Sequence, residues 1–183
     1  MIEVYSRSDL GEIIWRRIEE QGPKCDLNDI DVSRITDMSY LFENSEFDGD
    51  ISKWDVSNVE NMEYMFYNSA FNGDISGWDV SNVKNMDFMF DGSQFNGDIS
   101  KWDTSKVENM SFMFTYSQFN GDLSKWDVSR VRDMFYMFSD SKFDGDISKW
   151  DVSNVTEMGF MFSNSPLNSK RPDWYNPKRT EIW

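Results

Sequence analysis

Hydrophobic positions recur along this chain of 183 residues with a period of 24. Three columns of large apolar residues carry the period. They are Trp54, Trp78, Trp102, Trp126 and Trp150; Phe47, Phe71, Phe95, Phe119 and Phe143; and Met62, Met86, Met110, Met134 and Met158. Self-similarity at a fixed period is the signature of a repeat architecture. The columns define five full units, at residues 47–70, 71–94, 95–118, 119–142 and 143–166, which follow one degenerate unit.

The first half of each unit predicts a short strand. In "ISKWDV", Ile51, Trp54 and Val56 have the apolar spacing of a leucine-rich-repeat strand. Successive side chains of a strand point to opposite faces, so Lys53 and Asp55 face away from Trp54. We expect these strands to form a parallel sheet with a polar outer face.

The second half of each unit predicts a short helix or 3-10 segment. Val59, Met62, Met65 and Phe66 recur at a spacing that places them on one helical face. Ser57 stands where an N-cap would accept the unpaired amides of the first turn.

A unit of 24 residues cannot bury its apolar positions alone, whereas stacked neighbours can. The predicted fold is an α/β solenoid, a right-handed coil of about six turns that resembles a leucine-rich repeat. It would occupy residues 23–166, with a parallel sheet on one face and short helices or 3-10 turns on the other. The tryptophan and methionine columns would form its continuous core.

The two ends of the chain do not follow the pattern, and a repeat stack needs covered ends. Residues 1–22 predict an N-terminal capping helix with Ser8 as N-cap and Gly22 at the stop. Residues 167–183 predict an irregular C-terminal cap, in which Trp174 and Tyr175 would cover the last unit. The whole chain would form one domain.

The charge balance narrows the classes of partner. There are 18 basic and 33 acidic residues, a net charge of −15. Nucleic acids and anionic membranes select basic surfaces, so we expect neither as a direct ligand. A basic protein partner or a cation remains compatible with this charge.

The composition also disfavours catalysis. The chain has no histidine, the commonest general base near neutral pH, and its single cysteine cannot form an internal disulfide. A carboxylate pair would need two unequal environments, whereas the repeated aspartates look equivalent. We therefore expect neither an enzyme nor a cofactor or metal centre.

No apolar run approaches the roughly 20 residues that cross a bilayer, so we expect no membrane insertion. The opening "MIEVYSRSDLGEIIWRR" has no apolar core of the signal-peptide type. We expect a cytosolic protein, or an exported one whose signal has been removed.

One family is resembled by three parts of the chain together: the repeat motif "FNGDISxWDVSNVxNMxxMF", the stretch "DIDVSRITDMSYLF" and the ending "SPLNSKRPDWY". They are similar to the BspA-like leucine-rich-repeat surface proteins, the DUF285 or mycoplasma lipoprotein repeat family, over about residues 25–175. The resemblance implies a repeat scaffold of bacterial, mycoplasmal or phage-associated proteins, often secreted or displayed at the cell surface. It implies binding to proteins or host factors, and it brings no catalytic residues.

Two acidic columns recur in every full unit. They are Asp50, Asp74, Asp98, Asp122 and Asp146, and Asp55, Asp79, Asp103, Asp127 and Asp151. Carboxylates one strand spacing apart repel, so each column needs compensation. The first column can accept backbone amides of its turn, and the second would face the lysines of neighbouring turns. The alternative is calcium between turns, although the dense D-x-D-x-G pattern of calcium loops is missing.

The predicted sheet face is the first candidate binding surface. Its residues are Lys53, Asp55, Asp79, Lys101, Asp103, Lys125, Asp127, Lys149 and Asp151, and Gly77 interrupts the lysine column. Repeat scaffolds use such extended faces for binding.

A stripe of aromatic residues on the helical half is the second candidate. It consists of Tyr40, Tyr64, Phe88, Phe112, Tyr136 and Phe160. These rings either stack laterally between turns or form an exposed stripe for a partner or for self-association. Phe135, whose counterparts are polar or small, is a further candidate contact residue.

These features predict a non-enzymatic scaffold that binds a protein, such as a host or cell-surface protein, with a glycan as the alternative ligand. The competing hypothesis is an acidic decoy that imitates the phosphates of DNA and captures a basic nucleic-acid-binding protein.

Overall fold

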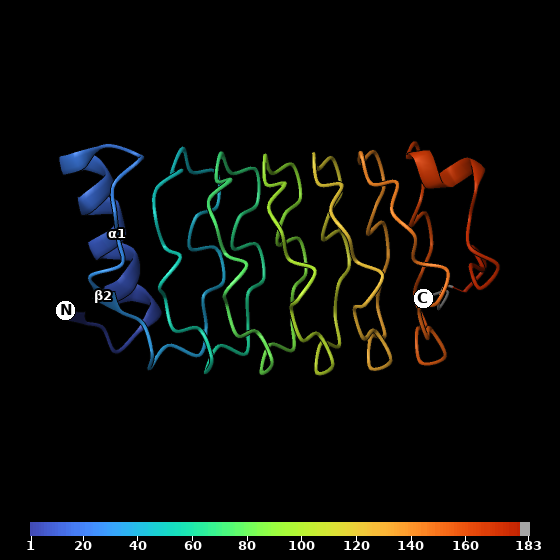
Figure 1. Cartoon of the computed structure of the whole chain (residues 1–183), viewed down its shortest axis with the longest axis horizontal. Helices are drawn as coiled ribbons and strands as arrows, with labels where there is room; N and C mark the ends of the chain where they lie inside the picture. The colour runs from blue at the N-terminus through green and yellow to red at the C-terminus, as the bar shows by residue number, and fades with distance from the viewer. Residues whose placement is uncertain (180–183) are drawn as a thin grey trace.

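In the computed structural model, which describes residues 1–179, successive units of 24 residues lie side by side along the long axis (Figure 1). Backbone hydrogen bonds join each unit to the next. The amide of Met62 donates to the carbonyl of Asn85 at 2.9 Å, and Met86 donates to Asn109 at 3.0 Å. The same bond recurs further along, and it sets the register between units.

Few residues belong to regular helices or strands. The elements of the described part are β1 (Ile2–Glu3), α1 (Arg7–Gln21), β2 (Ile30–Asp31) and the 3-10 helix η1 (Pro166–Ser169). Strands β1 and β2 pair in parallel, with Ile2 opposite Ile30. This small sheet joins the start of the chain to the first unit.

Helix α1 covers the N-terminal end of the stack (Figure 1). It begins two residues earlier than predicted, because Ser6 rather than Ser8 is the N-cap, and the Ser6 hydroxyl accepts the amide of Asp9 at 3.1 Å. Leu10 and Ile14 are fully buried against the units. Gly22 ends the helix with φ of 87°, a backbone that glycine adopts at little cost.

The predicted strand in the first half of each full unit is wrong, and among the described units only the degenerate first one has a strand there, β2. The described residues contain turns there, with the amide of Trp54 donating to Ile51 O at 3.2 Å and the amide of Val59 to Val56 O at 2.9 Å. The cause is local. The carboxylate of Asp55 accepts the amide of Ser57, and this bond favours a turn over a strand.

The predicted helix in the second half is also wrong. Tyr64 has a left-handed backbone with φ of 54°, which stops a right-handed helix. The amide of Tyr64 instead donates to Asp87 O in the next unit at 2.9 Å, and isolated parallel bridges such as Asn61 with Asn85 lie alongside. The sheet-like pairing thus lies on the aromatic side of each unit, and Ser57 caps no helix.

The core is a set of continuous ring and thioether columns. The five tryptophans of the repeat are only 3–5% exposed, and the five methionines are fully buried. Each indole N–H donates to a carbonyl 27 residues earlier, as in Trp78 with Ile51 O at 3.2 Å. Because an unpaired buried N–H is costly, this bond fixes the indole position in every unit. Phenylalanine rings also stack between units, with Phe66 and Phe90 centroids 5.6 Å apart.

The C-terminal segment keeps part of the repeat where we expected an irregular cover. Trp174 stacks on Trp150 with centroids 6.3 Å apart, and its indole donates to Ile147 O at 3.0 Å. Tyr175 packs edge-on against Phe162 at 4.9 Å. The segment therefore forms the start of a seventh unit. The rest of the predicted cap, residues 180–183, lies outside the described residues.

Candidate interaction surfaces

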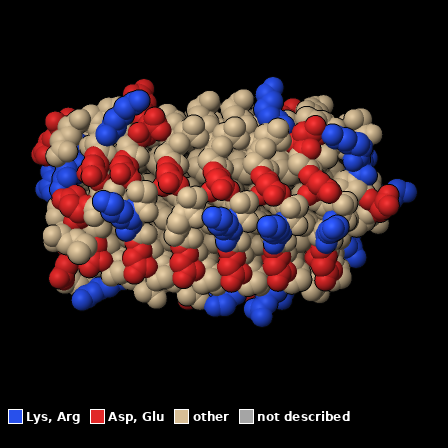
Figure 2. Space-filling view, in the orientation of Figure 1, with Lys and Arg blue, Asp and Glu red and all other residues tan. Residues whose placement is uncertain are grey.

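Three parallel rows of charge cover one face of the molecule, two acidic rows with a lysine row between them (Figure 2). The first acidic row is Asp50, Asp74, Asp98, Asp122 and Asp146, and the second is Asp55, Asp79, Asp103, Asp127 and Asp151. The lysine row is Lys53, Lys101, Lys125 and Lys149, and Gly77 interrupts it in the sequence. The two acidic rows are exposed along the whole length of the stack.

The first acidic row is held by its own turns, as the sequence predicts. Each carboxylate accepts the amide of the serine two residues on, as in Asp74 with Ser76 and Asp98 with Ser100, both at 2.9 Å. These amide bonds lower the pKa of the row's carboxyls. The row therefore stays ionised at neutral pH.

The second acidic row is held in the same way, so the predicted pairing with lysines is wrong. Asp79 accepts the amide of Ser81 at 3.0 Å, and serine hydrogen bonds lower the pKa of Asp79, Asp127 and Asp151. Within residues 1–179, no ion pair joins the lysine row to the second acidic row. The lysines instead lie nearer the first row, where Lys101 helps to lower the pKa of Asp98.

The aromatic stripe is a continuous stack of six rings. Neighbouring centroids lie 4.4–5.1 Å apart from Tyr40 to Phe160, with interplanar angles of 5–23°. The four inner rings are half-buried, whereas Tyr40 is 40% and Phe160 55% exposed. Arg7 lies over the outer face of Tyr40, 5.8 Å from the ring centroid. Of the two arrangements open to the sequence, the structure has lateral stacking with exposed edges and ends.

All six stripe residues have left-handed backbone, with φ of 54–60°. This conformation costs non-glycine residues free energy, and nothing in the residue types signals it. A second left-handed column is easier to recognise, because its residues mostly tolerate such backbone. It consists of Asn44, Asn68, Gly92, Tyr116, Asp140 and Asn164. Tyr116 is the exception, and its ring is 63% exposed.

Phe135 broadens the stripe in its C-terminal half. Its ring meets Phe112, Tyr136 and Phe160 edge-on, with centroids 5.7, 4.6 and 6.0 Å away. Edge-to-face contacts of this kind stabilise aromatic clusters. The half-buried Phe135 is therefore a packed member of the aromatic cluster as well as a candidate contact.

Two carboxyl groups beside the stripe have the most strongly raised pKa values, which the repeat pattern does not indicate. Burial raises the pKa of Asp91 to about 7 and that of Asp87 to about 6. Ser111 donates its amide and hydroxyl to Asp87 at 2.9 and 3.0 Å, which partly offsets the burial. Asp91 is only 9% exposed and has no side-chain hydrogen bond to any described residue. Its ionisation therefore opposes folding.

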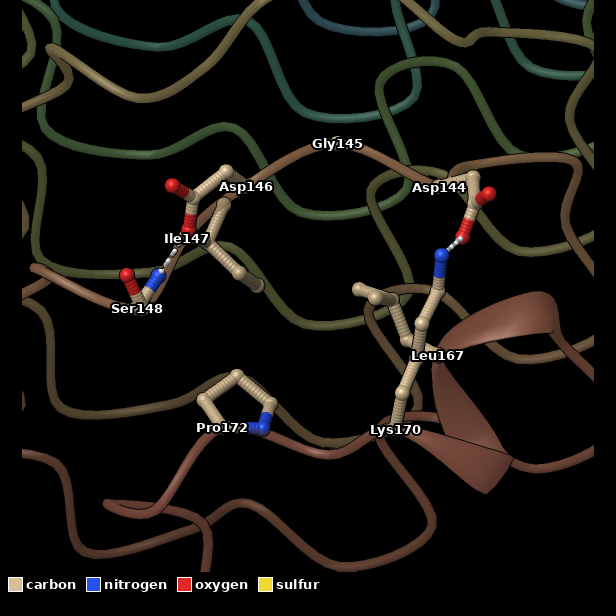
Figure 3. Close-up of a pocket in the computed structure, with 8 residues that line it drawn as sticks. All are labelled: Asp144, Gly145, Asp146, Ile147, Ser148, Leu167, Lys170 and Pro172. Carbon is tan, nitrogen blue, oxygen red and sulfur yellow. Dashed lines mark hydrogen bonds and ion pairs between the residues drawn. The ribbon is translucent and has the colours of Figure 1, made fainter.

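A hollow of ≈ 230 Å³ lies between the last full unit and the C-terminal segment (Figure 3). Ile147, Leu167 and Pro172 form its apolar wall, and the ion pair of Lys170 with Asp144, at 2.5 Å, lies at its edge. The amide of Ser148 donates to Asp146 there, as the corresponding serine does in every full unit.

Two further results concern metals and membranes. Within residues 1–179, no three carboxylate or thiol side chains are grouped so as to hold a metal ion. No helix in the same part of the chain is long and apolar enough to cross a membrane.

The stacked units and their ordered surface columns define a class of repeat protein. Its core consists of aromatic and methionine side chains, and its surface carries long rows of charge. The sequence matches the family described as "Mycoplasma protein of unknown function, DUF285" over residues 16–118 and 92–181. The chain belongs to this family, as its motifs indicate. No curated protein and no solved structure matches it.

Proposed function

We propose that this chain is a non-enzymatic solenoid scaffold, of the leucine-rich-repeat kind, that binds a protein partner through its charged face. One observation carries the proposal: the lysine row, with its one gap at Gly77, and the second acidic row run in fixed register along the stack (Figure 2). Such an array fits an extended partner that presents basic and acidic side chains in turn.

The acidic rows are suited to recognition because they are already organised. Each carboxylate is fixed by a serine amide, as in Asp127 with Ser129 at 2.9 Å, and the same bonds keep it ionised. Binding therefore costs little side-chain ordering, and complementary charges raise both the association rate and the specificity.

The absence of catalysis is part of the proposal. Acid–base chemistry needs two titratable groups of unequal pKa facing one substrate. The row aspartates have nearly equal surroundings, and the two carboxyls with the most strongly raised pKa values, Asp87 and Asp91, belong to the aromatic half of their unit. The family match is consistent with such a protein.

The acidic decoy is the second candidate, and the two acidic rows support it (Figure 2). The lysine row between them argues against it, since phosphates of DNA have no interleaved cations. The aromatic stripe is the other candidate surface for a partner or for a second copy.

The test is a pull-down with the full chain and two neutralised forms. One carries Lys101→Gln and Lys125→Gln, and the other carries Asp103→Asn and Asp127→Asn, which keep the oxygen that accepts the serine amide. A partner of the charged face should bind about tenfold more weakly to both forms. Lys142→Gln, at a position where Gln94 and Gln118 stand in other units, is the matched control.

Each outcome separates the candidates. Loss with the aspartate form alone, together with competition by duplex DNA, would favour the decoy. A partner that binds all forms equally well would rule out the charged face and leave the aromatic stripe as the surface to examine.

A further inference from the structure

A second hollow lies where the fifth full unit meets the fourth. It measures ≈ 520 Å³ and is lined by Glu108, Arg130, Arg132, Asn154 and Thr156. The hollow has a simple origin in the repeat. Two long arginines in one unit are followed, at the same positions of the next unit, by the short Asn154 and Thr156.

The two arginines lie on the same side of the chain. Val131 between them is buried, whereas Arg130 and Arg132 are both exposed. The backbone beneath them is held firmly, because the amide of Arg132 donates to Glu108 O and its carbonyl accepts the amide of Thr156, both at 2.8 Å. The pair is therefore fixed at its base, and both side chains are free to reach a ligand.

This pair of cations occurs once among the described units. The same two positions elsewhere hold Arg34 and Thr36, Asn58 and Glu60, Asn82 and Lys84, Lys106 and Glu108, and Asn154 and Thr156.

The other cations at these positions have partners. Lys84 forms an ion pair with Glu60 at 2.7 Å, and Lys106 donates to Asn82 Oδ1 at 2.7 Å. Arg34 lies over the Tyr5 ring, 5.0 Å from its centroid. By contrast, neither the Arg130 nor the Arg132 guanidinium makes a hydrogen bond or ion pair with a described residue.

Two carboxylates near the hollow would repel a bound anion. Glu108 lines the hollow itself, and Asp127 is close enough for Arg130 to help lower its pKa. The lining nevertheless holds two guanidinium groups against one carboxylate, on a chain whose net charge is −15. Asn154 adds a donor, because only one N–H of its amide is needed for the bond to Ser129 O at 2.7 Å.

We propose that the Arg130–Arg132 hollow binds a phosphate group. Guanidinium forks match the oxygens of a phosphate, and two of them can hold three oxygens from two sides. The proposal is independent of the protein-binding function. The group can be free inorganic phosphate or a phosphoryl group carried by another molecule, and the chemistry of the site is shared by both.

The first experiment is a titration of the full chain with inorganic phosphate at constant ionic strength, balanced with chloride. The Nε–H resonances of the arginines are followed by NMR. We expect saturable shifts at Arg130 and Arg132 with a Kd on the order of 1 mM. Shifts no larger than those in chloride alone would overturn the proposal.

Matched variants come from the repeat itself. Arg130→Asn and Arg132→Thr copy the residues of the next unit, so each should fold normally and weaken binding about tenfold. Glu108→Thr copies Thr156 and removes the opposing carboxylate, so it should tighten binding severalfold. Lys106→Asn copies Asn82 and should leave the affinity unchanged. Equal affinity in all four variants would also overturn the proposal.

The source of the phosphate is separated by a third titration, with a short phosphoserine peptide and its unphosphorylated form. Tighter binding of the phosphopeptide than of inorganic phosphate supports a phosphoryl group on a partner, and equal binding supports the free ion. Binding of the two peptides with equal affinity at Arg130 and Arg132 would contradict a phosphate site.

Discussion

Two columns of left-handed residues show how single side chains balance backbone cost in this protein. In the stripe, Phe112 has φ of 54°, and its stacking on Phe88 and Tyr136, at 4.4 and 5.1 Å, offsets that cost. In the second column, most residues tolerate such backbone, and amides bridge neighbours, as in Asn68 with Asn44 at 2.8 Å. Tyr116 has neither compensation, since its ring stacks on no other described aromatic residue.

Tyr116→Asn should therefore stabilise the protein, by about 1 kcal/mol in urea unfolding, because asparagine suits a left-handed backbone better than tyrosine. Phe112→Asn is the control at nearly the same φ, and it should destabilise because it removes two stacked contacts. If Tyr116→Asn lost stability, an internal role for the tyrosine ring would replace this interpretation.

At the scale of elements, the sequence predicted α1 well and the two halves of each unit poorly. The apolar positions Leu10 and Ile14 follow a helical period that continues for several turns, so only the start of the helix moved. Within a unit, the apolar spacing at Trp54 and Val56 indicates which residues are buried. It cannot distinguish a strand from successive turns. The turns depend on aspartate–serine bonds and on left-handed residues, which periodicity does not detect.

The candidate site followed the same division. The members of the charged rows and of the stripe could be listed from the repeat alone, since a period of 24 assigns every column. The turn amides that bind the first acidic row were also predicted. The partners of the second acidic row were not, because they depend on the path of the turns. Asp91 was missed because its burial follows from the left-handed segment around Phe88.

The tryptophan column makes a prediction about the C-terminal end. Trp174→Ala removes the ring that stacks on Trp150 and packs on Phe162, so the last full unit should lose about 2–3 kcal/mol of local stability. In a stack, each unit depends mainly on its neighbours. Hydrogen exchange should therefore speed up in residues 143–166 and stay unchanged in residues 47–70.

The control for this end is Trp15→Ala, at a tryptophan of α1 that is 48% exposed. It should leave exchange in the last full unit unchanged. A uniform rise along the whole chain after Trp174→Ala would show that the stack unfolds as one cooperative body.

At the scale of the whole molecule, two sets of carboxyls change the free energy of unfolding with pH in opposite directions. The lowered pKa values of the rows add stability that is present above the unfolded pKa and lost as pH falls through the folded values. The raised pKa values of Asp87, Asp91 and Asp133 add stability at low pH that is lost as pH rises towards the folded values.

The melting temperature should therefore be highest between about pH 4 and pH 5 and should fall towards pH 8. Asp91→Thr should flatten that fall and add about 2 kcal/mol at pH 8, with little effect near pH 5. Thr115, the counterpart in the next unit, already donates its hydroxyl to Tyr136 O at 2.8 Å, so the position accepts threonine. A melting curve of the variant that still fell as steeply towards pH 8 would contradict the role of Asp91.

The unit-to-unit register has a consequence for how the chain can change over generations. Because each coil presents to its neighbour the donors that the previous coil presented to it, as Met62 and Met86 do, a coding segment of one period can be copied or dropped by unequal recombination and still leave matching ends. The length of the protein can then change by whole units. Point mutations, as at Gly77, make single units differ from the rest.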